Sequence, residues 1–170
     1  MQVPNEKITQ APLFNGLTED EMEKVLSLAR QITWSRGETI VTEDEMGETI
    51  YILYSGAIKI SKRLTLPQFA DETGYSEKTL LHMDASEPVV IGEVAMLTKA
   101  ERSATITATS DCAGLEIYGP DLVKLCESDT ALGFKIIRNL TQILSSRLRK
   151  ANHDIVKLAT ALSVAVSQGR

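Results

Sequence analysis

The stretch TIYILYSGAIKI, from Thr49 to Ile60, gives the strongest indication of the fold. β-Branched and aromatic residues fill it, and Gly56 divides it into two segments of strand length. Similar segments, ITW, ETIV, KTLLHM and SATITATSDCAGLEIY, lie on both sides of it, with glycines such as Gly37 and Gly47 where turns are needed. Several short strands at this spacing predict a β-sandwich or a β-barrel.

Helical patterns flank these strands. Thr18 and Glu21 form a capping box, and the apolar residues that follow predict a helix over Glu19–Arg30. After Tyr118 the period is helical again, with a short helix in DLVKLCES and a much longer one from about Thr130 to Val166. The sequence therefore predicts an α+β fold, in which an eight-stranded antiparallel β-barrel is flanked by an N-terminal helix and by C-terminal helices, the last one long.

The expected division of the chain follows these patterns. Residues 1–128 contain the barrel, its N-terminal helix and the short helix after it, and residues 129–170 contain the long helix. We expect the polar segment Lys62–Ser76 to be an enlarged hairpin loop and the acidic run Glu43–Glu48 to be a solvated turn. Trp34 and Tyr51 are expected in the barrel core.

The long helix carries a second pattern. Apolar residues recur at alternating steps of four and three: Leu144, Leu148, Ala151, Ile155, Leu158, Leu162 and Ala165. This spacing is the seam of a coiled coil and predicts a homodimer, whose orientation stays open. In the alternative interpretation Leu144 and Leu148 pack on the barrel and a missing domain covers the remainder.

Composition excludes several classes of protein. The net charge of −5 and the lack of a basic cluster argue against nucleic-acid binding. The longest nearly apolar run, Leu158–Val166, is too short for a membrane span, and two cysteines favour free thiols in the cytoplasm. With two histidines, no nucleophile elbow and no phosphate-binding loop of the Walker type, we expect neither a metal site, nor a cofactor, nor an enzyme.

The stretch IGEVAMLTKAERSAT, from Ile91 to Thr105, interrupts the strands with a different pattern. It can be a loop closed by a Glu93–Arg102 ion pair. It can also be a cradle for a ligand, since Gly92 allows close approach of the backbone and Arg102 offers a fork of donors to an anion. Ser103 adds a hydroxyl and, with Ala104, unhindered N–H groups.

The cradle favours one kind of ligand. Glu93 accepts hydrogen bonds and suits a hydroxyl, whereas Arg102 suits a phosphate. A 3′,5′-cyclic nucleotide has one diffuse negative charge and one free ribose hydroxyl, the 2′-OH, close to it. Both interpretations of this stretch stay open at this point.

Together, GETIYILYSGAIKI, IGEVAML and RSATITA resemble the cyclic nucleotide-binding domain of catabolite activator protein, protein kinase A regulatory subunits and cyclic-nucleotide-gated channels. The resemblance runs from about Leu13 to Asn152 and implies a jelly-roll-like double-stranded β-helix. It does not extend to a helix-turn-helix domain. It implies a regulatory module that binds a cyclic nucleotide and signals through the long helix, which also acts as a lid.

The resemblance also implies residue roles. Glu93 would bind the ribose 2′-OH and Arg102 the cyclic phosphate. The remaining implied site residues are Gly92, Val94, Ser103 and Ala104 in the cassette, Ile60 in the barrel wall, Arg147 as the partner of Glu93, and Asn152 near the base.

One departure affects the base. The Thr-Ser pair that reads adenine in catabolite activator protein is Ala151-Asn152 here, so the choice between cAMP and cGMP stays open, with cAMP favoured. Two further functions remain as alternatives. The chain can be the sensor part of a longer transcription factor, channel or signalling enzyme, or an interaction scaffold whose cassette stays empty.

Overall fold

Two four-stranded antiparallel sheets make up the centre of the molecule, in a computed structural model that describes residues 6–64 and 76–168. One sheet has the order β1-β8-β3-β6 and the other β2-β7-β4-β5. The strands are β1 Ala29–Trp34, β2 Thr39–Val41, β3 Thr49–Ser55, β4 Ala57–Leu64, β5 Ser76–Asp84, β6 Val89–Ile91, β7 Thr105–Ala108 and β8 Cys112–Tyr118. The eight strands that the sequence predicted are confirmed and their arrangement is jelly-roll-like, but the two sheets do not close into a barrel.

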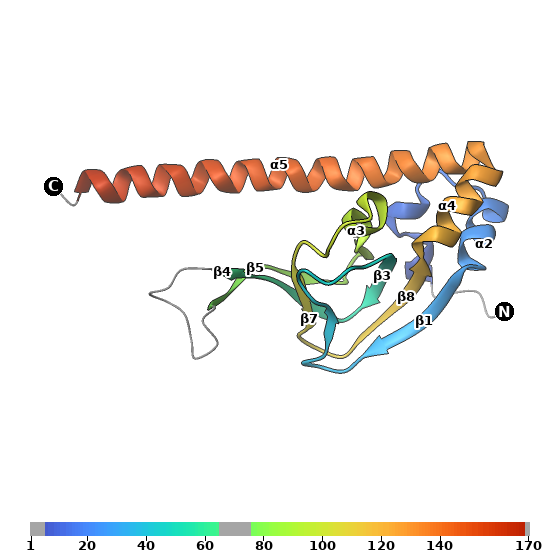
Figure 1. Cartoon of the computed structure of the whole chain (residues 1–170), viewed down its shortest axis with the longest axis horizontal. Helices are drawn as coiled ribbons and strands as arrows, with labels where there is room; N and C mark the ends of the chain where they lie inside the picture. The colour runs from blue at the N-terminus through green and yellow to red at the C-terminus, as the bar shows by residue number, and fades with distance from the viewer. Residues whose placement is uncertain (1–5, 65–75, 169–170) are drawn as a thin grey trace.

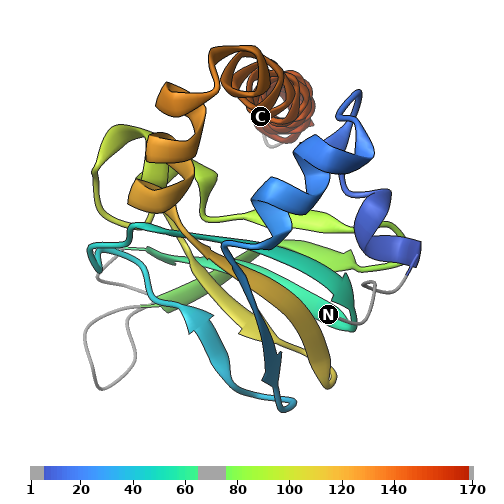
Figure 2. The same cartoon turned by 90° about the vertical axis from the view of Figure 1, so that its right-hand side faces the viewer.

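Helices gather on one side of these sheets, as the view along the long helix shows (Figure 2). They are α1 Glu6–Thr9, the 3₁₀ turn η1 Pro12–Phe14, α2 Glu19–Leu26, α3 Glu93–Thr98, α4 Gly119–Ser128 and α5 Thr130–Gln168. The last of them has 39 residues. It begins at the helical end beside α2 and α4, crosses the molecule, and projects on the opposite side, where β4 and β5 lie (Figure 1).

Two apolar clusters follow from the alternation along the strands. In β3, Ile50 and Ile52 face the helices, where they join residues such as Leu13, Leu122 and Ile136. Leu53, the next residue after Ile52, belongs to the cluster between the sheets, with Trp34, Ile58, Ile91 and Ile106. The helical cluster therefore joins the N-terminal segment, the first sheet and the beginning of α5.

The beginning of α5 is fixed by polar contacts as well. The Asn139 side chain is buried and donates to the carbonyl oxygens of Leu13 and Asn15, each at 2.8 Å. Nζ of Lys135 lies 2.6 Å from a carboxylate oxygen of Glu21 in α2. These contacts hold the N-terminal segment against α5.

The structure corrects several boundaries. The capping box of Thr18 and Glu21 is confirmed, but α2 ends at Leu26 instead of Arg30. Ala29 and Arg30 belong to β1, since they pair with Ile117 and Glu116 of β8. Long-range strand pairing outweighs the helical spacing at these positions.

The loop that the sequence predicted at Lys62–Ser76 has strand residues at both of its ends. Residues 62–64 complete β4, and Ser76 begins β5. The remainder of the predicted loop, residues 65–75, lies outside the described residues. Among residues 6–64 and 76–168, no helix combines the length and the apolar character that crossing a membrane requires.

Candidate functional site

The predicted cassette forms a sharp turn into α3. Gly92 adopts a left-handed φ of 86°, and Glu93 begins the helix. A Cβ at Gly92 would lie 2.5 Å from Nη1 of Arg102 and 2.6 Å from the carbonyl oxygen of Thr49. Only glycine therefore permits the turn and the close approach of Arg102.

Glu93 is the most deeply buried carboxylate of the cassette, at 1% exposure. Its Oε1 accepts a hydrogen bond from Nη1 of Arg147 in α5, while Nη2 of Arg147 donates to the carbonyl oxygen of Val90. Its Oε2 is buried, and no group within residues 6–64 and 76–168 donates a hydrogen bond to it. A buried acceptor without a donor is costly, so Oε2 is suited to a hydroxyl that a ligand brings.

Arg102 is also buried, at 7% exposure. Nη1 donates to the carbonyl oxygen of Gly92 at 3.1 Å, and the guanidinium carbon lies 6.0 Å from the ring centroid of Tyr51. Burial lowers the pKa of Arg102, an effect that nearby Tyr51 and Glu93 oppose. Since a guanidinium stays protonated in proteins, the result is a desolvated cation suited to an anionic ligand.

The ion pair considered from the sequence does not form. In the described parts of the chain, the salt-bridge partner of Glu93 is Arg147, and Arg102 has no carboxylate partner within 4.0 Å. Glu93 and Arg102 therefore do not close the loop by pairing with each other.

The turn between β2 and β3 holds Arg102 in place. The Arg102 N–H donates to the carbonyl oxygen of Glu45 at 2.8 Å, and the Asp44 N–H donates to the carbonyl oxygen of Arg102 at 3.0 Å. A Cβ at Gly47 would lie 2.0 Å from Nε of Arg102. The acidic run is therefore exposed at Asp44 and Glu45, as expected, but its backbone is also a wall of the cassette.

A pocket of about 410 Å³ opens beside Arg102. Its polar lining includes Glu45, Glu48, Lys99 and the two tyrosines Tyr51 and Tyr118. Of the predicted site residues, Arg102 alone lines it. The sequence predicted Tyr51 in the core; its ring does meet Trp34 edge to face, but it also contacts Arg102.

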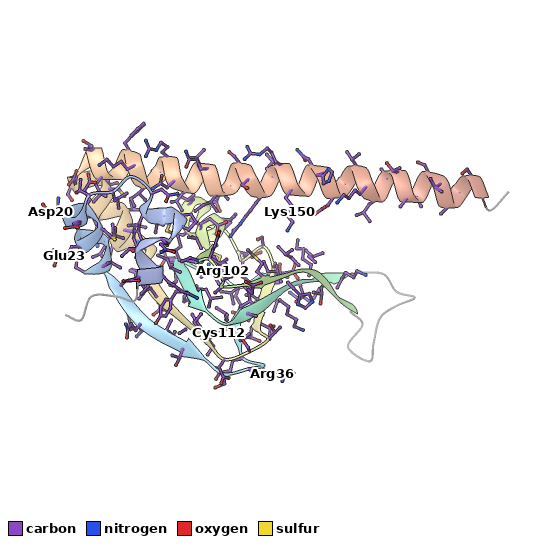
Figure 3. All side chains as sticks on the ribbon, turned by 180° about the vertical axis from the view of Figure 1, so that it is seen from behind. Asp20, Glu23, Arg36, Arg102, Cys112 and Lys150 are labelled. Carbon is purple, nitrogen blue, oxygen red and sulfur yellow. The ribbon has the colours of Figure 1, made fainter. Side chains whose placement is uncertain are left out.

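The other predicted residues lie around this centre. Ser103 is exposed, Ala104 is half-buried, and Val94 is exposed on α3. Ile60 is half-buried on β4, opposite Leu81 and Ile106. The structure thus brings together Gly92, Glu93, Arg102 and Arg147, with Arg102 beneath α5 in Figure 3.

Asn152 is not part of this group. Its side chain is exposed on the projecting part of α5, more than one helical turn after Arg147. No described contact joins Asn152 to the cassette.

Comparison with known proteins supplies the family. Residues 31–129 match the sequence profile of the cyclic nucleotide-binding domain. The cyclic AMP receptor protein of Thermus thermophilus is 27% identical over 145 residues, which are 85% of this chain and 61% of that protein. The chain therefore spans less than two thirds of this relative.

Solved structures agree with this match. The crystal structure of the Thermus thermophilus catabolite activator protein has a TM-score of 0.69 and 26% identity, covering 88% of this chain and 63% of that one. The regulatory domain of Toxoplasma gondii PKA, co-crystallised with cAMP, has a TM-score of 0.54 and 26% identity, covering 67% of this chain and 40% of that one. The profile match covers more than half of the chain, which therefore belongs to the cyclic nucleotide-binding domain family.

Proposed function

We propose that this chain is a regulatory module that binds cAMP in the cassette and transmits its occupancy through α5. One observation carries the proposal: the buried Oε2 of Glu93 receives no hydrogen bond from the part of the chain that the structure describes, and it lies in the same cassette as the buried cation of Arg102. An unpaired acceptor and a desolvated cation suit a ligand that carries a hydroxyl beside a single negative charge. A cyclic nucleotide has both groups.

The proposed roles are those that the family resemblance implies, and the burial of Glu93 and Arg102 supports two of them. Oε2 of Glu93 accepts a hydrogen bond from the ribose 2′-OH, and the Arg102 guanidinium binds the cyclic phosphate. The backbone at Gly92 and Val94, and the backbone and hydroxyl of Ser103 with the N–H of Ala104, complete the contacts. Ile60 contacts the base from β4.

The proposed base preference rests on two relatives and on one residue of this chain. The Thermus thermophilus relative is named a cyclic AMP receptor protein, and the Toxoplasma gondii structure contains cAMP. Asn152 offers both a donor and an acceptor to a purine edge, but it must approach the cassette from the exposed face of α5. We propose cAMP over cGMP on the names of the relatives, with Asn152 as the residue that reads the base.

Arg147 supplies the proposed link to α5. From the helix it contacts Glu93 and the carbonyl oxygen of Val90. A ligand bound to Glu93 therefore changes the surroundings of Arg147, which attaches α5 to the cassette. A ligand shifts a conformational equilibrium only through such a difference in contacts.

A homodimer through the Leu144–Ala165 seam is part of the proposal. Leu148, Leu158 and Leu162 are 62%, 70% and 67% exposed, which disfavours the alternative in which the barrel covers Leu148. Leu144 is half-buried, so the exposed part of the proposed seam begins after it.

The test is calorimetric titration of cAMP and cGMP into the wild-type chain, Arg102→Ala and Arg149→Ala. Arg149 is exposed on α5, so its variant removes the same charge outside the cassette. We expect saturable binding to the wild type and to Arg149→Ala, and binding at least about tenfold weaker to Arg102→Ala, since a charged hydrogen bond contributes roughly 1.5–3 kcal/mol. No binding of either nucleotide to folded wild-type protein would overturn the proposal and leave the interaction scaffold.

A second candidate is that the module is the sensor part of a longer protein. The coverage of 61% of the Thermus thermophilus receptor favours it, because that relative contains a further segment outside the match. Sequencing of the complete reading frame distinguishes the two. The absence of catalysis, the lack of nucleic-acid binding and the cytoplasmic location stay predictions of the sequence.

A further inference from the structure

The pocket beside Arg102 differs from the predicted cassette in the residues that surround it. Its volume of about 410 Å³ lies in the range of small-molecule sites, roughly 300–1,000 Å³. Its walls come from β2, β3 and the turn between them, from Arg102, and from the residues at the end of α3 and the start of α4. Among the described residues that line it, neither Glu93 nor Arg147 occurs. A ligand in this pocket is therefore not held as the cassette would hold a ribose.

The inner part of the pocket combines apolar walls with one buried cation. Ile40 and Val41 of β2 are 8% and 7% exposed, and the half-buried Tyr51 of β3 also belongs to the lining. Arg102 has no carboxylate within 4.0 Å in the described parts of the chain. Its guanidinium lies against the backbone of Gly47, where a Cβ would be 2.4 Å from Cζ of Arg102. A buried cation of this kind suits a carboxylate that is attached to an apolar body.

The outer part of the pocket is exposed and carries both signs of charge. Glu45 and Glu48 lie in the turn between β2 and β3, and Lys99 follows α3. The Tyr118 hydroxyl donates to Oε2 of Glu48 at 2.9 Å, and this hydrogen bond raises the pKa of Tyr118. Two carboxylates at the rim favour an ammonium group on the ligand.

The charges of the whole lining balance. Burial raises the pKa of Tyr51, so both tyrosines of the pocket are neutral at pH 7. In the described lining, the two cations Lys99 and Arg102 then face the two carboxylates of Glu45 and Glu48. A ligand that carries both charges but has no net charge matches this arrangement.

We propose that this pocket binds a small zwitterion with an apolar body, the chemical class of the apolar amino acids. The ligand carboxylate binds Arg102 in the inner part, the ammonium group binds Glu45 and Glu48 at the rim, and the apolar body packs against Ile40 and Val41. A simple anion would meet the two rim carboxylates, and a simple cation would meet Arg102, so like charge disfavours each of them. Binding of the zwitterion does not require that the cassette takes cAMP.

A coupling between the two ligands rests on the proposed function. The cyclic phosphate and the carboxylate of the zwitterion would both approach the guanidinium of Arg102, and two anions at one cation repel each other. Each ligand should therefore weaken the binding of the other. The factor must be the same in both directions, because coupling between two sites is reciprocal.

The test is calorimetric titration of leucine, leucinamide and N-acetylleucine into the full chain. Leucinamide keeps the ammonium group and lacks the carboxylate, whereas N-acetylleucine keeps the carboxylate and lacks the ammonium group. We expect saturable binding of leucine. Leucinamide should bind at least about tenfold more weakly, because it leaves the buried cation of Arg102 unpaired. N-acetylleucine should bind about twofold to fivefold more weakly, the range of an exposed ion pair.

A charge variant at the rim tests the ammonium contact. Glu48→Gln keeps an oxygen that accepts from the Tyr118 hydroxyl, so it removes the charge alone. It should weaken the binding of leucine about twofold to fivefold and leave the binding of N-acetylleucine unchanged. Glu87→Gln, exposed between β5 and β6 and outside the pocket lining, is the matched control and should change neither. An equal loss for both probes in Glu48→Gln would indicate a structural effect and contradict the contact.

Three outcomes would overturn this inference. They are no binding of leucine to the folded wild type up to its solubility, equal binding of leucine and leucinamide, and equal binding of leucine and N-acetylleucine, which would leave a site for simple carboxylates.

Titration of cAMP with and without leucine separates the two proposals. Binding of cAMP without binding of leucine overturns this inference alone, and binding of leucine without binding of cAMP overturns the proposed function alone. When both bind, leucine at saturation should raise the apparent dissociation constant of cAMP at least about threefold. An unchanged constant would contradict the coupling through Arg102.

Discussion

The two halves of α5 have similar apolar content and opposite surroundings. In the first half Leu132, Ile136 and Leu140 are at most 1% exposed, whereas Leu158 in the second half is 70% exposed. The first half also holds Asn139 and Arg147, whose side chains bind the N-terminal segment and the cassette. Apolar spacing on a helix thus identifies a contact face, but it does not indicate whether that face packs within the same chain or against another molecule.

The largest expected difference between the halves is in the effect of truncating one apolar side chain. Ile136→Ala should lower the free energy of unfolding by about 2–5 kcal/mol, because it leaves a cavity in the helical core. Leu158→Ala should change it by less than about 0.5 kcal/mol at protein concentrations where the chain is monomeric. Urea denaturation at low protein concentration measures both, and similar losses would show that the projecting half is packed within the monomer.

Arg147 lies where the two halves meet, and its removal should have the next largest effect. Arg147→Ala leaves the buried carboxylate of Glu93 without its cation, and we expect a loss of about 1.5–3 kcal/mol. Arg149→Ala, two residues further along and exposed, is the matched control. If both variants unfolded at the same urea concentration as the wild type, the ion pair of Arg147 with Glu93 would not contribute to stability.

The two halves of α5 should also differ in how much an asparagine side chain contributes to stability. Asn139→Ala removes the donor shared by the carbonyl oxygens of Leu13 and Asn15, at an expected cost of about 1–2 kcal/mol. Asn152→Ala in the projecting half should leave stability unchanged, because Asn152 is exposed. Thermal denaturation monitored by circular dichroism measures the pair, and an equal shift in Tm would argue against the anchoring role of Asn139.

The smallest expected effect depends on pH. The hydrogen bond from Lys135 lowers the pKa of the Glu21 carboxyl below its ordinary 4.5, with a further contribution from the Thr18 N–H. A carboxyl with a lowered pKa in the folded state stabilises the protein above its unfolded pKa, and this contribution is lost as the pH falls through the folded value. Glu21→Gln should therefore lower Tm at pH 7 and make little difference well below pH 4.5.

The matched control for these Tm measurements is Asp121→Asn, which removes an exposed ion pair with Lys124 inside α4. It joins no part of the chain to α5, so we expect almost no change in Tm at either pH. A difference between wild type and Glu21→Gln that stayed constant from pH 7 to pH 3 would rule out the Glu21–Lys135 pair as its source.

Local signals in the sequence were sufficient for much of the fold. The capping box at Thr18 and the alternation in β3 act over a few residues, so their outcome can be predicted without knowing what lies opposite. The end of α2 could not be predicted in this way, because Ala29 and Arg30 are held as strand by β8, more than eighty residues later. The short α1 and η1 carry no helical period and depend on the core that they contact.

Some residues of the candidate site could likewise be predicted from local sequence, and others could not. Spacing and composition singled out Gly92, Glu93 and Arg102 within one short stretch. The pairing of Glu93 with Arg147 came from the family resemblance, since the two residues lie on separate elements. The contact of Tyr51 with Arg102 left no signal at all, because an aromatic residue in a strand is ordinarily core.

The core shared by the N-terminal segment and the beginning of α5 has a consequence for synthesis. Ile8, Leu13 and Phe14 pack in one cluster with Leu132, Ile136 and Leu140. Every strand of both sheets is synthesised before those last three side chains, so the apolar face of the nascent first sheet lacks part of its cover until translation has passed Leu140. A polypeptide stalled within α4 would expose that face to chaperones, although all of its strands and its whole cassette had already been translated.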